Sequence, residues 1–139
     1  MKRSETFATL LGSVALVAMT GCTPGTVDCP AIGWINTLTV EVTGQVPLVR
    51  SIQLCTKEGC APGVDLDPSS PLNLIQLIGQ EGQRWSFATD MLPLEELTVR
   101  TLDVDGAVSS ETVVTPEWKR IGGSEACGGP STAVVSVTS

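Results

Sequence analysis

The most constraining feature of the sequence is a strict alternation of apolar and polar residues between positions 37 and 43. In TLTVEVT, Leu38, Val40 and Val42 are apolar, whereas the residues between them are threonine or glutamate. Successive side chains of a β-strand point to opposite faces, so this pattern predicts a half-buried strand that ends at Gly44. The β-branched residues favour the same conformation.

Similar short strands are expected along the rest of the chain, separated by turns. The expected strands are residues 49–55, 85–89, 97–102, 108–114 and 132–138, and residues 72–78 fit either a strand or a short helix. The residues expected to face the core are Ile52, Leu54, Trp85, Phe87, Thr89, Leu97, Val99, Thr101, Ala133, Val135 and Val137. Turns are marked by the proline-rich segment 61–71 and by Asp105-Gly106.

This succession predicts an all-β fold, a single antiparallel immunoglobulin-like β-sandwich of about seven strands, with a small closed barrel as the alternative. Within residues 85–114, a strand, a proline-marked corner, the segment TVR and a D-x-D-G hairpin follow one another. That order is similar to the closing half of immunoglobulin-like, fibronectin-type or carboxypeptidase-regulatory-like domains. The resemblance implies a sandwich, although the chain has no tyrosine and therefore no tyrosine corner.

Residues 1–21 have the layout of a secretory signal. Lys2 and Arg3 give a positive start, an apolar run follows, and small residues lead into Cys22. The run of about 14 residues is shorter than the roughly 20 of a membrane-spanning helix. The exit Met19-Thr20-Gly21-Cys22 resembles the lipobox of bacterial lipoprotein precursors.

The lipobox resemblance implies that Cys22 becomes the lipidated N-terminus of an exported protein held at the bacterial cell membrane. The domain organisation expected from it is a signal peptide at 1–21, a short tether at 22–28 and a β-sandwich domain at 29–139. The alternative is a plain signal peptide that is cleaved elsewhere, with Cys22 as a spare thiol.

The cysteine count supports the lipoprotein interpretation. Of the five cysteines, Cys22 is assigned to the lipid, which leaves an even number for disulfides in an oxidising compartment. The spacing favours Cys55 with Cys60 and Cys29 with Cys127, although four cysteines permit three connectivities. A zinc site made of the same four residues is the alternative, but structural zinc usually draws on two close pairs.

The charge of the mature chain bears on its partners. Without Lys2, Arg3 and Glu5, the eight basic and fifteen acidic residues become six and fourteen, a net charge of −8. Such a surface repels nucleic acid. The expected partners are therefore the membrane, through the N-terminal lipid, and an unknown protein or glycan.

The sequence lacks the residues that most catalytic and metal sites need. Histidine is absent, which removes Ser-His-Asp and Cys-His catalysis and H-E-x-x-H zinc chemistry. The phosphate-binding and nucleophile-elbow motifs are absent as well. We therefore expect a non-enzymatic protein with no cofactor, no metal and no catalytic residues.

Two alternatives use carboxylates. The pairs Asp65 with Asp67, Glu95 with Glu96, and Asp103 with Asp105 could serve an exported hydrolase, but each fits ordinary turn or helix-end chemistry. The segment DVDG suggests a calcium-dependent adhesion-type module. An EF-type loop needs glutamate at its twelfth position, where this chain has Val114.

The most plausible contact regions are two loops, residues 56–71 and 115–130. Loops carry many of the binding residues of β-sandwiches. Trp118, Asp65 and Asp67 are the candidate contact residues within them. The predicted function is that of a membrane-anchored module that binds or scaffolds a partner at the cell envelope.

Overall fold

The computed structural model describes residue 25 and residues 27–44, 48–63 and 66–139. The predicted signal peptide and Cys22 lie outside this part of the chain. The described elements, in order, are β1 (Thr37–Thr43), β2 (Ser51–Thr56), β3 (Gly59–Ala61), the 3-10 helix η2 (Pro71–Leu74), β4 (Gln76–Glu81), β5 (Arg84–Ala88), β6 (Leu97–Leu102), β7 (Val108–Val114), β8 (Lys119–Arg120) and β9 (Ser131–Thr138). Among these residues, none of the helices is long and apolar enough to cross a membrane.

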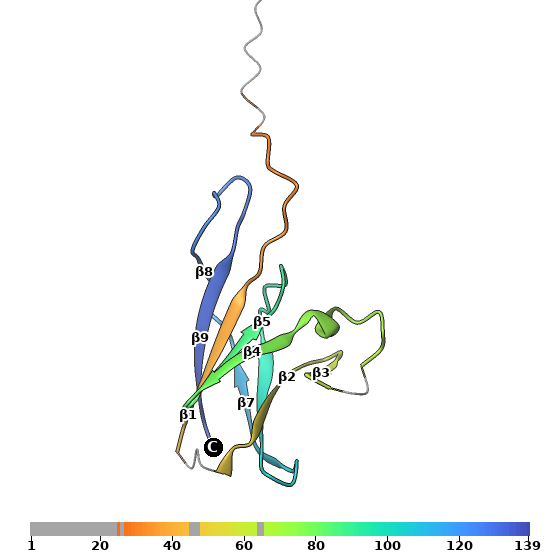
Figure 1. Ribbon diagram of the computed structural model, residues 1–139, viewed down its shortest axis with the longest axis vertical. Helices are drawn as coiled ribbons and strands as arrows, with labels where there is room; N and C mark the ends of the chain where they lie inside the picture. Colours follow the sequence, from red (N-terminus) through yellow and green to blue (C-terminus); the bar gives the residue numbers. More distant parts are fainter. Residues whose placement is uncertain (1–24, 26, 45–47, 64–65) are drawn as a thin grey trace, which may run out of the picture.

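The strands form two sheets, which confirms an all-β, sandwich-like fold and excludes the closed barrel (Figure 1). One sheet has the order β4-β5-β1-β9-β8, and the other has the order β3-β2-β6-β7. The prediction of purely antiparallel sheets was wrong, because β1 and β9 pair in parallel, from Thr37 opposite Thr132 to Thr43 opposite Thr138. Alternation in the sequence shows which face a side chain takes, but it carries no information about strand direction.

The strand count also differs from the prediction of about seven, since nine strands occur in the described residues. The extra ones are short: β3 has three residues and β8 has two. Such pieces are too brief to show a period of two. The ambiguous segment 72–78 divides between the end of η2 and the start of β4.

The core lies between the inner faces of the two sheets, and the predicted inward residues are all buried. Trp85 opposes Val40 across β5 and β1, and Phe87 opposes Leu38 in the same register. From the other sheet, Leu54 opposes Val99. Burying a large apolar side chain of this kind contributes roughly 1.5–3 kcal/mol, so these positions dominate the stability of the domain.

One end of the sandwich is built from segments that are far apart in the sequence. Residues 27–36, which lead into β1, run beside the loop 121–130, which leads into β9 (Figure 1). The disulfide Cys29–Cys127 joins them. The turn between β6 and β7 lies at the opposite end of the sandwich (Figure 1). The start of β2 lies at that end as well, since Ser51 pairs with Leu102, the last residue of β6.

Candidate functional site

The structure settles how four of the predicted site residues are used. Cys29 pairs with Cys127, and Cys55 pairs with Cys60, as predicted. The zinc alternative is therefore wrong, since all four sulfur atoms are in disulfides. Cys22 and Asp65 lie outside the described residues.

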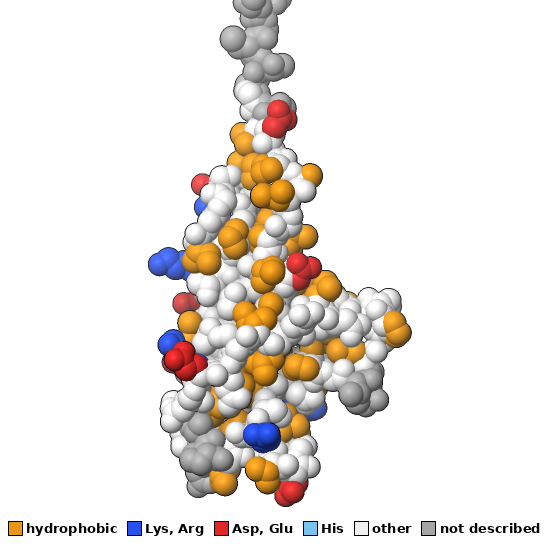
Figure 2. Space-filling model, in the orientation of Figure 1, with side chains coloured by type: hydrophobic (Ala, Val, Ile, Leu, Met, Phe, Trp, Pro, Cys, Tyr) orange, Lys and Arg blue, Asp and Glu red, His pale blue; other side chains and the backbone are white. Residues whose placement is uncertain are grey.

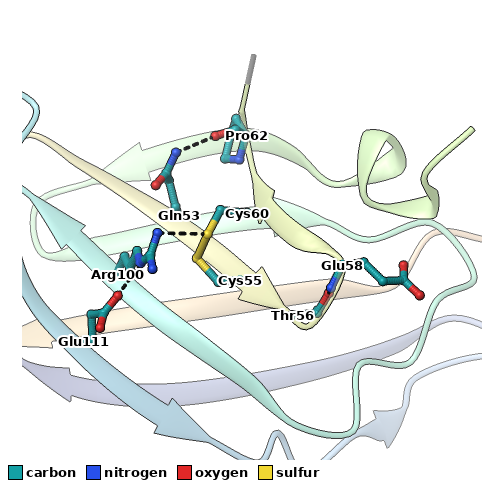
Figure 3. Close-up of a disulfide and its surroundings, with 8 residues drawn as sticks. All are labelled: Gln53, Cys55, Thr56, Glu58, Cys60, Pro62, Arg100 and Glu111. Atoms are coloured by element: carbon teal, nitrogen blue, oxygen red, sulfur yellow. Dashed lines mark hydrogen bonds and ion pairs between the residues drawn. A yellow bond between two sulfur atoms is a disulfide. The ribbon is translucent and has the colours of Figure 1, made fainter. Parts of the chain in front are cut away.

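The Cys55–Cys60 disulfide connects directly opposed residues of β2 and β3 on the outer face of the four-stranded sheet. Figure 3 shows the polar side chains around it. Arg100 from β6 places Nη1 3.3 Å from the Cys60 Sγ, and its guanidinium also pairs with the Glu111 carboxylate of β7. Gln53 donates from Nε2 to the Pro62 carbonyl at 3.0 Å. The disulfide and these contacts fix the start of the 56–71 loop against the sheet.

Beside this disulfide is a hollow of about 290 Å³, which we call the Cys60 hollow. Its lining residues are Gln53, Glu58, Gly59, Cys60, Gly63, Leu66 and Arg100. The hollow therefore combines one acidic, one basic, one amide and one apolar side chain. This mixture can hydrogen-bond a peptide or a sugar and bury a small apolar group.

Sequence reasoning identified the 56–71 loop but missed two strand residues of the hollow, Gln53 and Arg100. Both are partly exposed polar residues of strands, and many such residues merely face solvent. Only the strand order β3-β2-β6 brings them next to the loop. Their position beside the loop could not be inferred from their spacing in the sequence.

Asp67, a predicted contact residue, organises its own loop. Its Oδ1 accepts hydrogen bonds from the Ser69 hydroxyl and from the Ser69 backbone N–H, the latter at 2.8 Å. These bonds, from the side chain first and then the backbone, hold the pKa of the Asp67 carboxyl below its ordinary value of 3.8. The exposed carboxylate thus shapes the surface that a partner would meet.

Trp118, the other described contact candidate, is half-buried and packs against the core. Its indole N–H donates to the Leu94 carbonyl at 2.9 Å. The neighbouring Lys119 and Arg120 are exposed. Trp118 therefore anchors the 115–130 loop to the sandwich, and only part of its ring is available to a partner.

A second hollow lies at the end that residues 27–36 share with the loop 121–130. It has a volume of about 230 Å³ and is lined by Pro30, Ile32, Gly33, Trp34, Gly123, Ser124, Cys127, Gly128, Gly129 and Pro130. Trp34 packs on Gly128, whose φ of +75° favours glycine, and a Cβ there would make a tight contact of 3.1 Å with the ring. The lining is almost entirely apolar.

A wider hollow of about 550 Å³ opens on the outer face of the five-stranded sheet, over β1, β4 and β5. Its charged residues include Arg84, which pairs with Glu41 at 2.6 Å. Both side chains are substantially exposed, and such surface pairs contribute at most about 1 kcal/mol. The lining of this hollow is therefore that of an ordinary polar, solvent-exposed sheet face.

Two of the carboxylates considered for catalysis or calcium, Asp67 and Asp103, accept hydrogen bonds within turns. Asp103 Oδ1 accepts from the backbone N–H groups of Asp105 and Ala107, both at 2.9 Å, and so caps the β6–β7 turn. Across the described residues, histidine, cysteine and acidic side chains form no group of three or more suited to a metal ion.

Comparison with known proteins adds no functional assignment. The sequence matches no family model, and neither a curated protein nor a solved structure matches the chain.

Proposed function

We propose that the protein is an exported bacterial lipoprotein, anchored to the cell membrane by a lipid on Cys22, whose β-sandwich binds or scaffolds a partner at the envelope. The observation that carries this proposal is the use of the cysteines. Both disulfides form from the four cysteines other than Cys22. The fold thus accounts for each cysteine except the one that follows the lipobox-like exit Met19-Thr20-Gly21.

The disulfides also support export. A bridge between Cys29 and Cys127, 98 residues apart, persists in an oxidising compartment and is rare in a reducing cytoplasm. The same bridge fixes the first residues after the tether to the last loop of the domain. A pull on the membrane anchor is therefore transmitted to the body of the domain at a covalent crosslink.

The finer fold assignment is an immunoglobulin-like domain in the broad sense of two packed sheets that share an architecture without a shared strand order. In the immunoglobulin constant arrangement, the first and last strands belong to different sheets. Here β1 and β9 are neighbours in one sheet. The domain belongs with the sandwiches that depart from the constant-type order.

The proposed partner is a protein or a glycan, and the proposed contact surface is the 56–71 loop with the Cys60 hollow. In Figure 1 the described parts of this loop, residues 56–63 and 66–71, project sideways from the sandwich, away from the end that carries residues 27–36. A partner bound there would meet the domain without passing between it and the membrane. The engagement of Asp67 and Asp103 in turns favours this binding role over the carboxylate hydrolase and the calcium module.

Replacing the lipidated cysteine tests the proposal. In Cys22→Ala cells, we expect the protein to leave the membrane fraction or to remain as an unprocessed precursor. The matched control, Cys55→Ala with Cys60→Ala, also removes cysteine but keeps the lipobox, and it should remain processed and membrane-bound. A Cys22→Ala protein that is processed and fractionates like the parent would contradict the anchoring.

A further inference from the structure

Exposed apolar side chains gather at the end of the domain from which the tether leads. We call this surface the tether-proximal face and define it by Val27, Ile32, Ile35, Met91 and Ile121, whose exposed fractions lie between 47% and 69%. Figure 2 shows hydrophobic side chains clustered at this end of the molecule. Single exposed apolar residues are common, but a cluster of large ones marks a surface that contacts something else.

Contacts between backbone segments place these residues together. The Asn36 N–H donates to the Asp90 carbonyl at 2.8 Å, which sets Met91 beside the segment that carries Ile35. The Ile121 N–H donates to the Pro130 carbonyl at 2.8 Å, next to the apolar hollow that Ile32 lines. Cys29–Cys127 holds the two sides of the surface together.

The length of the tether indicates what covers this face. Val27 lies five positions after Cys22, and a fully extended chain of that length spans at most about 18 Å. The headgroup region on each side of a bilayer is itself roughly 5–8 Å thick. A lipid on Cys22 therefore keeps Val27, where the tether-proximal face begins, at or near the headgroups.

We propose that the tether-proximal face rests on the bilayer and inserts its apolar side chains among the lipid headgroups, so that the lipid anchor and the domain contact the membrane together. This inference rests on the proposed lipid anchor at Cys22. The exposed acidic residues Asp28 and Glu125 lie at this end, and the mature chain is strongly acidic, so the favoured surface is zwitterionic lipid. The contact fixes the orientation of the domain and leaves the 56–71 loop directed along the membrane, where a partner can reach it.

Tryptophan reporters in the mature, lipidated protein test the contact. Ile32→Trp and Ile121→Trp place a reporter on the tether-proximal face, and Val104→Trp places one in the β6–β7 turn at the opposite end. All three positions are exposed by at least 65%, so each substitution leaves the core unchanged. Each protein is reconstituted into phosphatidylcholine vesicles with brominated acyl chains, and its quenching is compared with that of the parent.

We expect the added fluorescence of Ile32→Trp and Ile121→Trp to be quenched at least about twofold more than that of Val104→Trp, because interfacial apolar side chains reach the boundary of the acyl chains. Equal, weak quenching at all three positions, in protein that floats with the vesicles, would contradict the membrane contact of the tether-proximal face. It would not contradict the lipid anchor at Cys22. If the two reporters on the tether-proximal face are shielded from the brominated lipid and the protein crosslinks chemically into dimers, a second copy of the chain covers this face. That result would also contradict the membrane contact. Protein that carries no lipid and does not float would remove the anchor, and the contact with it.

Discussion

The Asn36 side-chain carbonyl accepts a hydrogen bond from the Ser131 backbone N–H at 2.8 Å, although the two residues lie 95 positions apart. Asn36 is buried, and its backbone also bonds the two residues that follow β5: its N–H donates to the Asp90 carbonyl, and its carbonyl accepts from the Thr89 N–H. This residue therefore ties the entry of β1 to the start of β9, where the parallel pair of strands begins.

The first prediction concerns this link. Asn36→Ala removes a buried side chain and leaves the partly buried Ser131 N–H without its partner, so we expect it to lower the free energy of unfolding by about 1–3 kcal/mol. Asn73→Ala is the matched control, because the Asn73 side chain is exposed and donates to the Asp67 carbonyl within a surface loop. Urea unfolding of the two variants measures the difference, and an equal loss in both would contradict the structural role of Asn36.

The two disulfides differ in the length of chain that they close. Cys29–Cys127 spans 98 residues, and Cys55–Cys60 spans five. On the chain-entropy model, replacing the first pair by alanine costs about 5 kcal/mol and replacing the second costs about 2 kcal/mol. Chemical denaturation of the two double variants checks the order, and a larger loss from the short bridge would show that the model does not apply to this chain.

Two substitutions of Trp118 separate the contribution of its packing to stability from that of its hydrogen bond. Trp118→Phe keeps an aromatic ring against the core but removes the donor to Leu94, and we expect a loss of about 1 kcal/mol in unfolding free energy. Trp118→Ala also removes the packing and should cost more. If Trp118→Phe unfolds at the same urea concentration as the parent, the indole N–H has no role in holding the 115–130 loop.

Asp67 gives a prediction that depends on pH. Its folded-state pKa lies below 3.8, so its contribution to stability is present above that value and is lost as the pH falls through the folded pKa. In an NMR titration, the Asp67 carboxyl should have a midpoint below 3.8. Ser69→Ala removes the hydroxyl donor and should raise that midpoint, whereas Ser70→Ala, whose hydroxyl accepts from Leu72, should leave it in place. If the Asp67 midpoint is the same in Ser69→Ala as in the parent, the Ser69 hydroxyl is not the cause of the lowered pKa.

Much of the fold follows from local rules. The alternation of Leu38, Val40 and Val42 with polar residues correctly predicts the buried face of β1. A strand with one buried face and one solvent-exposed face needs apolar and polar residues in alternation. The pairing of Cys29 with Cys127 was favoured by spacing and by parity. The parallel pairing of β1 with β9 could not be predicted, since the same alternation serves either direction.

The candidate site was less predictable. The 56–71 loop was identified from its prolines and cysteines, but the Cys60 hollow also needs Arg100, which comes from β6 and reaches the loop only through the strand order. The tether-proximal face was missed for a similar reason. Ile32 and Ile121 are 89 positions apart in the sequence, and only the fold places them at one end.

The central claim is that Cys22 carries the anchor, and the mass of the mature protein tests it most directly. Protein extracted from the membrane fraction should begin at Cys22 and should weigh more than residues 22–139 by the mass of a diacylglyceryl group, with the ester-linked acyl chains released by mild base. A mature chain that begins at another residue, or that has an unmodified Cys22 thiol, would contradict the account.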